Sequence, residues 1–245
     1  MVKRFFVLLL MLLFLLGSAI ALWPYFNNLL FQFNMKESVS GFHGIYDLIT
    51  PTSPTQPTGT EEPVEFIPET YRDLWLDMKE YNQELWNTDQ QGLKGLNAVE
   101  ATCFRLADYG LESEIFGVLS IPSLNLEMPI YLGASSQNMA LGAAQMGQTS
   151  VPIGGVNTNT VIAGHRGWNG ADYFRYVPDL VPGDTVTITN LWQTLEYKVI
   201  DTKIISPNDV DAIKIIPGKE IITLFTCHPY ASGGRQRFLV FCERV

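Results

Sequence analysis

The sequence contains few cysteines and few basic residues, and each shortage excludes a class of protein. Three cysteines in 245 residues are too few and too scattered for a disulfide framework or a zinc site built from Cys-x-x-Cys pairs. Only 16 lysines and arginines stand against 25 aspartates and glutamates, which gives a net charge of −9. Since proteins that bind the nucleic-acid backbone need a basic surface, we expect no nucleic-acid partner. No ligand spacing predicts a metal or an organic cofactor.

Apolar residues make up 47% of the chain, which is enough for one hydrophobic core. They are concentrated at the N-terminus, where 18 of the first 22 residues are apolar and residues 5–22 carry no charge. As a helix, residues 5–22 would extend roughly 27 Å, close to the hydrocarbon thickness of a bilayer. Residues 1–22 are therefore predicted to form a transmembrane anchor.

Basic residues flank only the N-terminal side of this anchor. Lys3 and Arg4 precede it, and the next basic residue is Lys36. The positive-inside rule then predicts a single-pass protein of the cell membrane, with a cytoplasmic N-terminus and the rest of the chain outside the cell. Ala19 and Ala21 form a small-x-small pattern, which leaves a cleaved signal peptide as the alternative. Both interpretations export the rest of the chain.

Two segments precede the main domain. Residues 23–68 are predicted to be an extracellular linker or irregular segment, because they include a Pro- and Thr-rich stretch at 50–63 and otherwise show no clean periodicity. Residues 69–112 are predicted to be helical in part, because large apolar side chains between Tyr71 and Trp86 recur at steps of three and four.

Residues 113–245 have the pattern of a β-domain. Short β-branched and apolar runs alternate there with Gly, Pro, Asn and Asp. The turns Pro182–Asp184 and Pro217–Lys219 separate four of these runs. The pattern predicts a mostly β fold, a closed barrel of seven to eight strands with short helices. The candidate strands are 115–120, 124–130, 160–164, 185–189, 194–206, 220–226 and 237–242.

Two of these strands end at residues that can carry out acyl transfer. His165 follows the strand at 160–164, and Cys227 follows the strand at 220–226. A cysteine nucleophile needs its thiolate stabilised or its proton removed, and a neighbouring histidine can do either. An arginine can stabilise the developing oxyanion. Arg235 and Arg237 are both candidates, because residues two apart on a strand face the same side.

The remaining histidine and cysteines have no such surroundings. His43 lies in a polar, glycine-flanked segment and is predicted to be a surface residue. Cys242 lies inside an apolar run, and Cys103 has no catalytic partner nearby in the sequence. Since a free cysteine is often a small buried apolar residue, Cys103 and Cys242 are predicted to be bystanders.

The segment TLFTC at Thr223–Cys227 resembles the TLxTC motif of the sortase family, and the following His228–Tyr230 resembles the x-Pro-Tyr of its pilus-type, class C members. Further family motifs occur in the expected order. The resemblance covers about residues 71–245. The other matching segments are Tyr81-Asn82 with Leu85, Ile121-Pro122, Pro129–Tyr131, Thr149–Gly155, Ala163–Gly167 and Gly183-Asp184.

The resemblance implies a sortase-type β-barrel and a cysteine transpeptidase. Cys227 matches the nucleophile of the family and His165 its catalytic histidine, and Thr226 matches the threonine that helps to hold the substrate. The arginine falls on Arg237, because the arginine of the family precedes an apolar strand. Arg235 is the fallback.

The implied partners are the membrane, an LPxTG-bearing surface protein or pilin, and an amine acceptor. The sorting signal would be cleaved between Thr and Gly, and its acyl group joined to a pilin lysine or a cell-wall precursor. Class C enzymes usually have a second hydrophobic helix at the C-terminus, and this sequence ends at Val245 without one. That difference favours a housekeeping enzyme that attaches proteins to peptidoglycan. The Cys-x-Pro-Tyr segment favours pilus polymerisation. A hydrolytic cysteine protease and a catalytically silent anchored binding or assembly module are further alternatives.

Class C enzymes usually cover the cleft with a lid that bears Asp-Pro followed by an aromatic residue. This sequence has no such tripeptide. Residues 87–110 occupy the position of the lid in the order of motifs, and Asp89 is the only acid near its start. They are the candidate lid.

Overall fold

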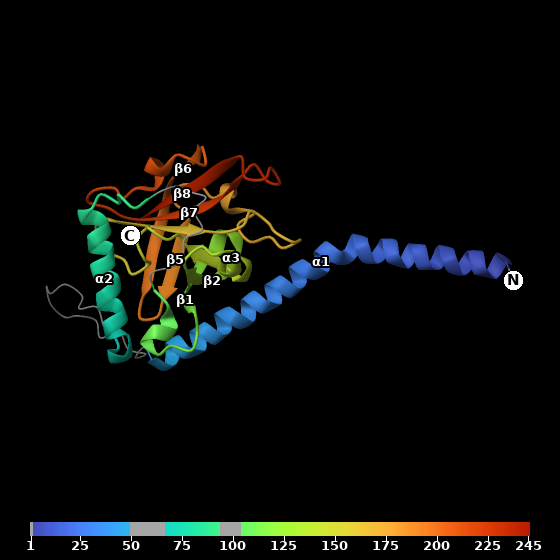
Figure 1. The fold of residues 1–245 in the computed structure, drawn as a ribbon, viewed down its shortest axis with the longest axis horizontal. Coiled ribbons are helices and arrows are strands. Elements are labelled where there is room, and N and C mark those ends of the chain that lie inside the picture. The colour runs from blue at the N-terminus through green and yellow to red at the C-terminus, as the bar shows by residue number, and fades with distance from the viewer. Residues whose placement is uncertain (1, 50–66, 94–103) are drawn as a thin grey trace.

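The computed structural model describes residues 2–49, 67–93 and 104–245. The Pro- and Thr-rich stretch at 50–63 and Cys103 lie outside these residues. Helices lie outside a β-barrel in the described part of the chain (Figure 1). The α-helices are α1 (Val2–Ile49), α2 (Arg72–Asn87) and α3 (Ser136–Leu141). The 3-10 helices are η1 (Glu69–Tyr71), η2 (Leu106–Tyr109), η3 (Pro122–Leu124), η4 (Val177–Asp179) and η5 (Val210–Ile213).

Eight strands close the barrel in the order β1-β2-β3-β4-β7-β8-β6-β5, with β5 pairing back to β1. The β2–β3 and β4–β7 pairs are parallel, and the others are antiparallel. The predicted closed barrel of seven to eight strands is confirmed. The strands are β1 (Ile115–Ile121), β2 (Leu126–Leu132), β3 (Ala143–Gln145), β4 (Thr158–Ala163), β5 (Thr185–Asn190), β6 (Thr194–Ile205), β7 (Glu220–His228) and β8 (Gln236–Arg244).

The strands of the barrel differ in how many of their faces are buried. Along β5, buried residues alternate with half-buried ones, so only one face lies in the core. By contrast, β4 is buried along its whole length. Ile162 packs in the core shared by the barrel strands, and Val161 packs on the other face with Ile213 of η5. With both faces covered, β4 can position a side chain at its end.

The two predicted turns are formed by glycines that adopt positive φ. Gly183 has φ +100° and Gly218 has φ +76°, values that L-residues with a side chain rarely adopt. Each follows a proline, whose ring presets the preceding turn position. These turns lead into β5 and β7, so local sequence determines where both strands begin.

The amphipathic helix predicted between Tyr71 and Trp86 is α2, and it packs against the outside of the barrel. Leu74 and Met78 are buried one turn apart. One turn further, the Asn82 amide accepts a hydrogen bond from the backbone N of Val151 at 2.8 Å and donates one to its carbonyl oxygen at 3.2 Å. The apolar stripe and this paired amide fix α2 to the loop before β4.

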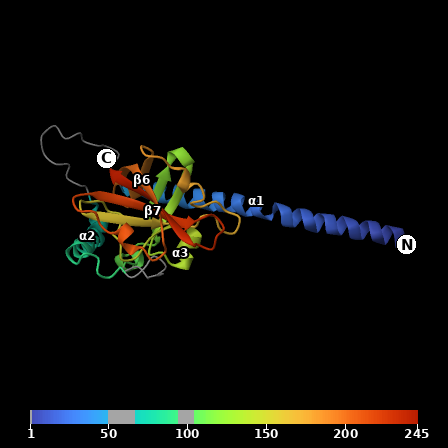
Figure 2. The same cartoon turned by 90° about the horizontal axis from the view of Figure 1, so that it is seen from above.

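Helix α1 extends far beyond the predicted anchor. Residues 23–49, for which an irregular structure was expected, continue the same helix to Ile49. Its N-terminal half projects away from the barrel, and its C-terminal half passes along β1 and β2 (Figures 1 and 2). Met35, Val39 and Phe42 are buried there, at the three- and four-residue spacing of one helix face. Packing against the barrel stabilises this half of the helix.

The N-terminal half of α1 is suited to cross a membrane. Its large apolar side chains from Phe5 to Leu16 are exposed, and an 18-residue window of the helix reaches a mean hydropathy of 2.9. Among the described residues, α1 alone is long and apolar enough for this role. Such a surface is favourable in lipid and costly in water. The long apolar helix therefore fits the predicted transmembrane anchor.

Candidate active site

Strands β4, β7 and β8 lie side by side, and their ends meet at one end of the barrel. Because β4 and β7 run parallel, Ala163 pairs with Phe225, and the chains reach His165 and Cys227 two residues later. Since β8 runs antiparallel to β7, Arg237 lies directly opposite Cys227. The topology therefore brings together the three predicted catalytic residues from segments far apart in the sequence.

Cys227 differs from the second described cysteine in its access to solvent. It lies near the end of β7, is half-buried and forms no disulfide. Cys242 lies in the core with no exposed surface, and burial raises the pKa of its thiol to about 12. A thiol with that pKa is protonated and unreactive at neutral pH. Of these two cysteines, Cys227 is therefore the candidate nucleophile.

Arg237 borders the same small volume as the Cys227 thiol. A Cβ added to Gly234 would lie 2.9 Å from Arg237 Nη1 and 3.2 Å from Cys227 Sγ. Arg237 is 8% exposed, and Nη1 donates to the carbonyl oxygens of Gly234 and Gln236. Arg235, in contrast, is exposed and precedes β8. The fork of Arg237 is thus fixed beside the thiol, where a donor to an oxyanion is needed.

Two aromatic rings pack against His165. Its ring stacks on Trp168 at 5.4 Å between centroids and meets the edge of Tyr173 at 5.6 Å. Burial among these groups lowers the pKa of His165. Within the described part of the chain, the imidazole makes no hydrogen bond. Its position therefore depends on ring packing, and both of its nitrogens remain available for proton transfer.

The glycine before His165 is required by packing. A Cβ on Gly164 would lie 2.5 Å from the Phe174 ring, well inside contact distance. The backbone N of Phe174 donates to the carbonyl oxygen of His165 at 2.8 Å. Gly164 therefore lets the returning chain close tightly behind the histidine.

Thr226 connects the end of β7 to the end of β4 through a hydrogen bond. It is 1% exposed, and its hydroxyl donates to the carbonyl oxygen of Gly164 at 2.8 Å. This bond ties the residue before Cys227 to the residue before His165. Contact of Thr226 with a substrate stays a prediction.

The sortase domain family model matches residues 119–245, which is more than half of the chain and includes the whole site. The chain belongs to the sortase family. Sortase D of Bacillus subtilis (strain 168) is 28% identical over 131 residues, which cover 53% of this chain and 63% of the relative. The match therefore spans less than two thirds of that curated relative's length.

Solved sortase structures share the fold. Sortase C-1 from Actinomyces oris superposes with a TM-score of 0.64 and 30% identity, covering 73% of this chain and 99% of that one. Sortase C1 of GBS pilus island 1 gives a TM-score of 0.68 and 27% identity, covering 86% and 92%. The resemblance carried by the sequence motifs is confirmed, and this sortase is most like class C.

Two residues that sequence reasoning missed lie beside Cys227, the candidate nucleophile. Arg166 Nη1 lies 2.6 Å from His228 Nδ1 and donates to the Cys227 carbonyl oxygen at 3.5 Å. Burial, and to a lesser degree the charge of Arg166, lowers the pKa of His228. The sequence held a signal, because each residue directly follows a predicted catalytic one. The pair links the backbone of Cys227 to the His165 strand end.

The candidate lid of this sortase lies only partly within the described residues, because 94–103 fall outside them. Asp89, at the start of the candidate lid, is exposed. The pKa of Lys214 is raised by its hydrogen bond and ion pair with Asp211, and to a lesser degree by Asp89. The side chain of Gln90 is buried and accepts a hydrogen bond from Ile215 N at 2.7 Å. A lid role for residues 87–110 and Asp89 stays a prediction.

Proposed function

We propose that this sortase is a membrane-anchored cysteine transpeptidase whose reaction centre is Cys227, His165 and Arg237. The observation that carries the proposal is the pairing of Cys227 with Arg237 across β7 and β8, with both side chains bordering the position that a Cβ at Gly234 would occupy. The half-buried histidine at the neighbouring strand end and membership of the sortase family support it.

The reaction follows from the chemistry of these groups. The Cys227 thiolate attacks the carbonyl carbon of the Thr–Gly bond in an LPxTG-like sorting signal and forms a C–S bond. Arg237 donates hydrogen bonds to the oxyanion. As the C–N bond breaks, His165 gives its proton to the departing glycine nitrogen, leaving a thioacyl intermediate. An incoming amine attacks this thioester, transfers a proton to His165 and releases the Cys227 thiolate.

The acceptor amine in our proposal is a lysine of a pilin subunit. The similarity to class C structures, one of which is named for a pilus island, supports this choice. A pilin that carries an LPxTG-like signal would then be both the acyl donor and the acceptor. The amine of a peptidoglycan precursor is the acceptor to compare against.

The catalytic domain lies outside the cell in this proposal, with α1 as a single-pass anchor. The exposed apolar half of α1 and the basic residues Lys3 and Arg4 before it support this orientation. Packing of Met35, Val39 and Phe42 against the barrel gives the second half of the helix a structural role. A chain that began at Glu69 would lose these core residues, so the enzyme should be tested with α1 intact.

The proposal is tested with the full chain in detergent, an LPxTG-type peptide and two amines, a lysine-bearing pilin-type peptide and a peptidoglycan-type pentapeptide amine. Mass spectrometry follows the joined products. We expect a Thr-linked product that forms faster with the lysine peptide. Cys227→Ala should lower the rate by at least about a thousandfold, as expected for loss of a nucleophile.

Cys242→Ala is the matched control, because it removes the buried thiol and keeps Cys227. It should retain the parent rate at temperatures where the chain stays folded. If Cys227→Ala forms product as fast as the parent, the mechanism is wrong. A faster reaction with the pentapeptide amine would instead reject the pilin acceptor and keep the transpeptidase.

A further inference from the structure

The segment that follows His165 is held by the anchor helix. Residues 165–175, here called the His165 loop, run from the end of β4 to η4. The Asn27 side chain donates to the carbonyl oxygen of Asn169 at 3.2 Å. Asn28 makes a paired contact with Asp172, since its amide nitrogen donates to the carboxylate and its amide oxygen accepts from the backbone N, both at 3.3 Å. Helix α1 therefore supplies polar partners at two points of the loop.

Two closer contacts leave little room between α1 and the His165 loop. A Cβ on Gly170 would lie 2.9 Å from the Cα of Pro24 and 3.1 Å from its carbonyl oxygen, and Gly170 has φ +83°. The Phe31 ring lies against the Tyr173 ring, with 4.1 Å between centroids. Adding a side chain at Gly170, or removing the ring of Phe31, would thus change how the His165 loop packs against α1.

One of the residues that α1 contacts, Tyr173, also packs against the histidine. Tyr173 packs against Phe31 on one side and forms an edge-to-face pair with His165, and its hydroxyl donates to the Ala140 carbonyl oxygen at 2.8 Å. Trp168 lies one residue before Asn169 and stacks on the His165 ring, with 5.4 Å between the ring centroids. Since His165 makes no hydrogen bond within the described residues, these rings and its backbone are what hold it.

The backbone of the His165 loop adds a reason why it needs support. Asn169 has φ +50° and Tyr173 has φ +43°, conformations that are uncommon for residues with a side chain, above all for a bulky one. Such conformations persist where surrounding contacts over-determine them. Both residues lie directly against α1, through Asn27 and Phe31, so the helix supplies those contacts.

We propose that Asn28 and Phe31 of α1 are positioning residues for His165, so that the anchor helix is part of the reaction centre's support. The inference rests on the proposed function in taking His165 as the proton-transfer group. A misplacement of about 1 Å in a reacting group can cost about 100-fold in rate. The enzyme would then reach its full rate only with α1 docked on the His165 loop.

The test uses the full chain in detergent and four variants, two that alter the contact with the His165 loop and two controls. Asn28→Asp keeps the shape of the side chain but places a carboxylate against that of Asp172, and Phe31→Ala removes the ring that packs against Tyr173. Val39→Ala is the matched control for docking, because Val39 is buried on the barrel face of the same helix and packs outside the cluster that contains Tyr173. Phe33→Ala, on the exposed face, controls for changes in the helix itself.

The first readout is the single-turnover rate of thioacyl formation. We expect Asn28→Asp and Phe31→Ala to lower it about 10- to 100-fold with little change in KM, and Val39→Ala and Phe33→Ala to stay within about threefold of the parent. Circular dichroism confirms that each variant is folded at the assay temperature. Equal losses in Phe31→Ala and Val39→Ala would mean that α1 contributes stability alone, which would overturn the inference.

The second readout does not depend on any reaction. An NMR titration of the His165 ring, assigned with His165→Gln, should show its pKa rising in Asn28→Asp and Phe31→Ala as the enclosing rings loosen, and remaining at the parent value in both controls. If the parent forms no thioacyl adduct but this pattern is seen, the proposed function fails and the positioning role stands. An unchanged His165 titration in both loop-facing variants would contradict the positioning role.

Discussion

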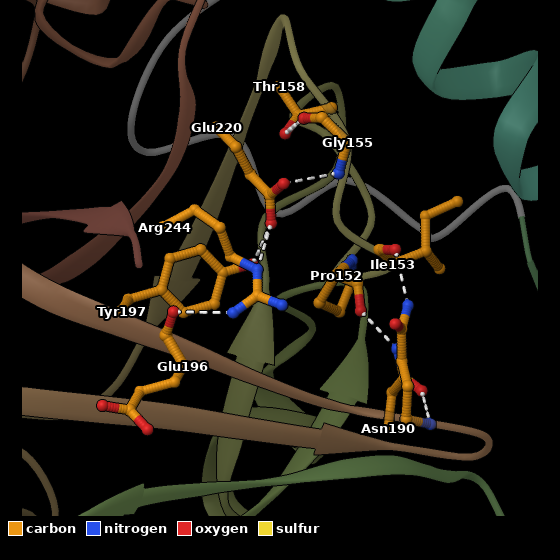
Figure 3. A network of polar contacts seen from close by, with 10 residues as sticks. Pro152, Ile153, Gly155, Thr158, Asn190, Glu196, Tyr197, Glu220 and Arg244 are labelled. Atoms are coloured by element: carbon orange, nitrogen blue, oxygen red, sulfur yellow. Dashed lines mark hydrogen bonds and ion pairs between the residues drawn. The ribbon is translucent and has the colours of Figure 1, made fainter. Parts of the chain in front are cut away.

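The two ends of strands β4, β7 and β8 differ in whether their polar side chains have hydrogen-bond partners within the protein. At the end remote from the candidate active site, Glu220 at the start of β7 accepts hydrogen bonds from Gly155 N and the Tyr197 hydroxyl, both at 2.9 Å (Figure 3). Arg244, on β8, lies 3.3 Å from the same carboxylate. The Thr158 hydroxyl, on β4, donates to the Gly155 carbonyl oxygen at 2.6 Å. Every one of these groups has a partner within the protein.

At the end with the candidate active site, two polar groups lack such partners. Within the described residues, the Cys227 thiol near the end of β7 and the His165 imidazole just after β4 make no hydrogen bond. Buried polar groups that partner one another contribute to stability, and those left available for a substrate contribute to function. We therefore expect changes at Glu220 to affect unfolding and changes at Arg237 to affect turnover.

Of the changes considered, replacing Arg237 should have the largest effect, and that effect should be on kcat. Arg237→Lys keeps the charge but loses the planar fork that donates two hydrogen bonds. We expect kcat to fall about 100- to 1,000-fold, as for loss of an oxyanion donor. Steady-state kinetics with the sorting-signal peptide measure this loss.

Arg235→Lys is the matched change two residues away, at an exposed position. It should leave kcat within about twofold of the parent, as is usual for surface substitutions. A full loss in Arg235→Lys with normal turnover in Arg237→Lys would move the oxyanion donor to Arg235.

The two described cysteines should differ by at least about 100-fold in alkylation rate, because thiolates are the reactive species and burial raises the pKa of Cys242 to about 12. Iodoacetamide labelling of the folded chain near neutral pH, followed by peptide mapping, measures each site separately. In denaturant the two rates should converge. Comparable labelling in the folded chain would show that the core around Cys242 opens readily.

At the opposite end, Glu220→Gln should lower the free energy of unfolding by about 1–3 kcal/mol, because it removes the charged partner of Arg244 in a largely buried site. Turnover well below the unfolding temperature should be unchanged. Glu196→Gln is the control, since that carboxylate is half exposed and 3.9 Å from Lys198, and a change below about 0.5 kcal/mol is expected. Urea unfolding followed by fluorescence compares them, and lost turnover in folded Glu220→Gln would break the contrast between the ends.

The smallest effect concerns pH. Burial lowers the pKa of His165, so the folded chain binds this proton at lower pH than the unfolded chain does. Between those two pKa values the unfolded state holds more protons, and the free energy of unfolding falls as pH decreases. Its slope against pH should be steeper in the parent than in His165→Gln, by at most about 1.4 kcal/mol per pH unit, the limit for one proton.

Urea unfolding at a series of pH values from about 7 to about 5 gives both slopes across the range where histidines titrate. Other groups contribute equally to the two chains, so the difference reports His165. Identical slopes would mean that His165 is as hydrated in the folded chain as in the unfolded one.

Much of the barrel could be predicted, because its turns carry strong local signals such as Gly183 and Gly218 at positive φ. Strand β3 was missed, since Ala143–Gln145 has three residues and none of them is β-branched. The continuation of α1 was missed for a different reason. Its buried stripe at Met35, Val39 and Phe42 follows helical spacing, but exposed apolar residues on its other faces obscure the pattern.

The candidate site also has parts that the sequence predicts and parts that it does not. His165 and Cys227 were identified because each follows an apolar strand and lies in a motif. The pairing of Arg237 with Cys227 depends on the register of β7 and β8, which the sequence does not specify, although the motif pointed to it. The contacts of α1 with the His165 loop join residues 142 and 144 positions apart, and no local pattern indicates such contacts.

The most direct test of the candidate active site is to locate the acyl group. The full chain is mixed with an LPxTG-type peptide without an amine, quenched in acid, digested and mapped by mass spectrometry. The account predicts a thioacyl adduct ending in Thr on the peptide that contains Cys227, retained in Cys242→Ala. An adduct on Cys103 or Cys242, or cleavage that continues in Cys227→Ala, would contradict it.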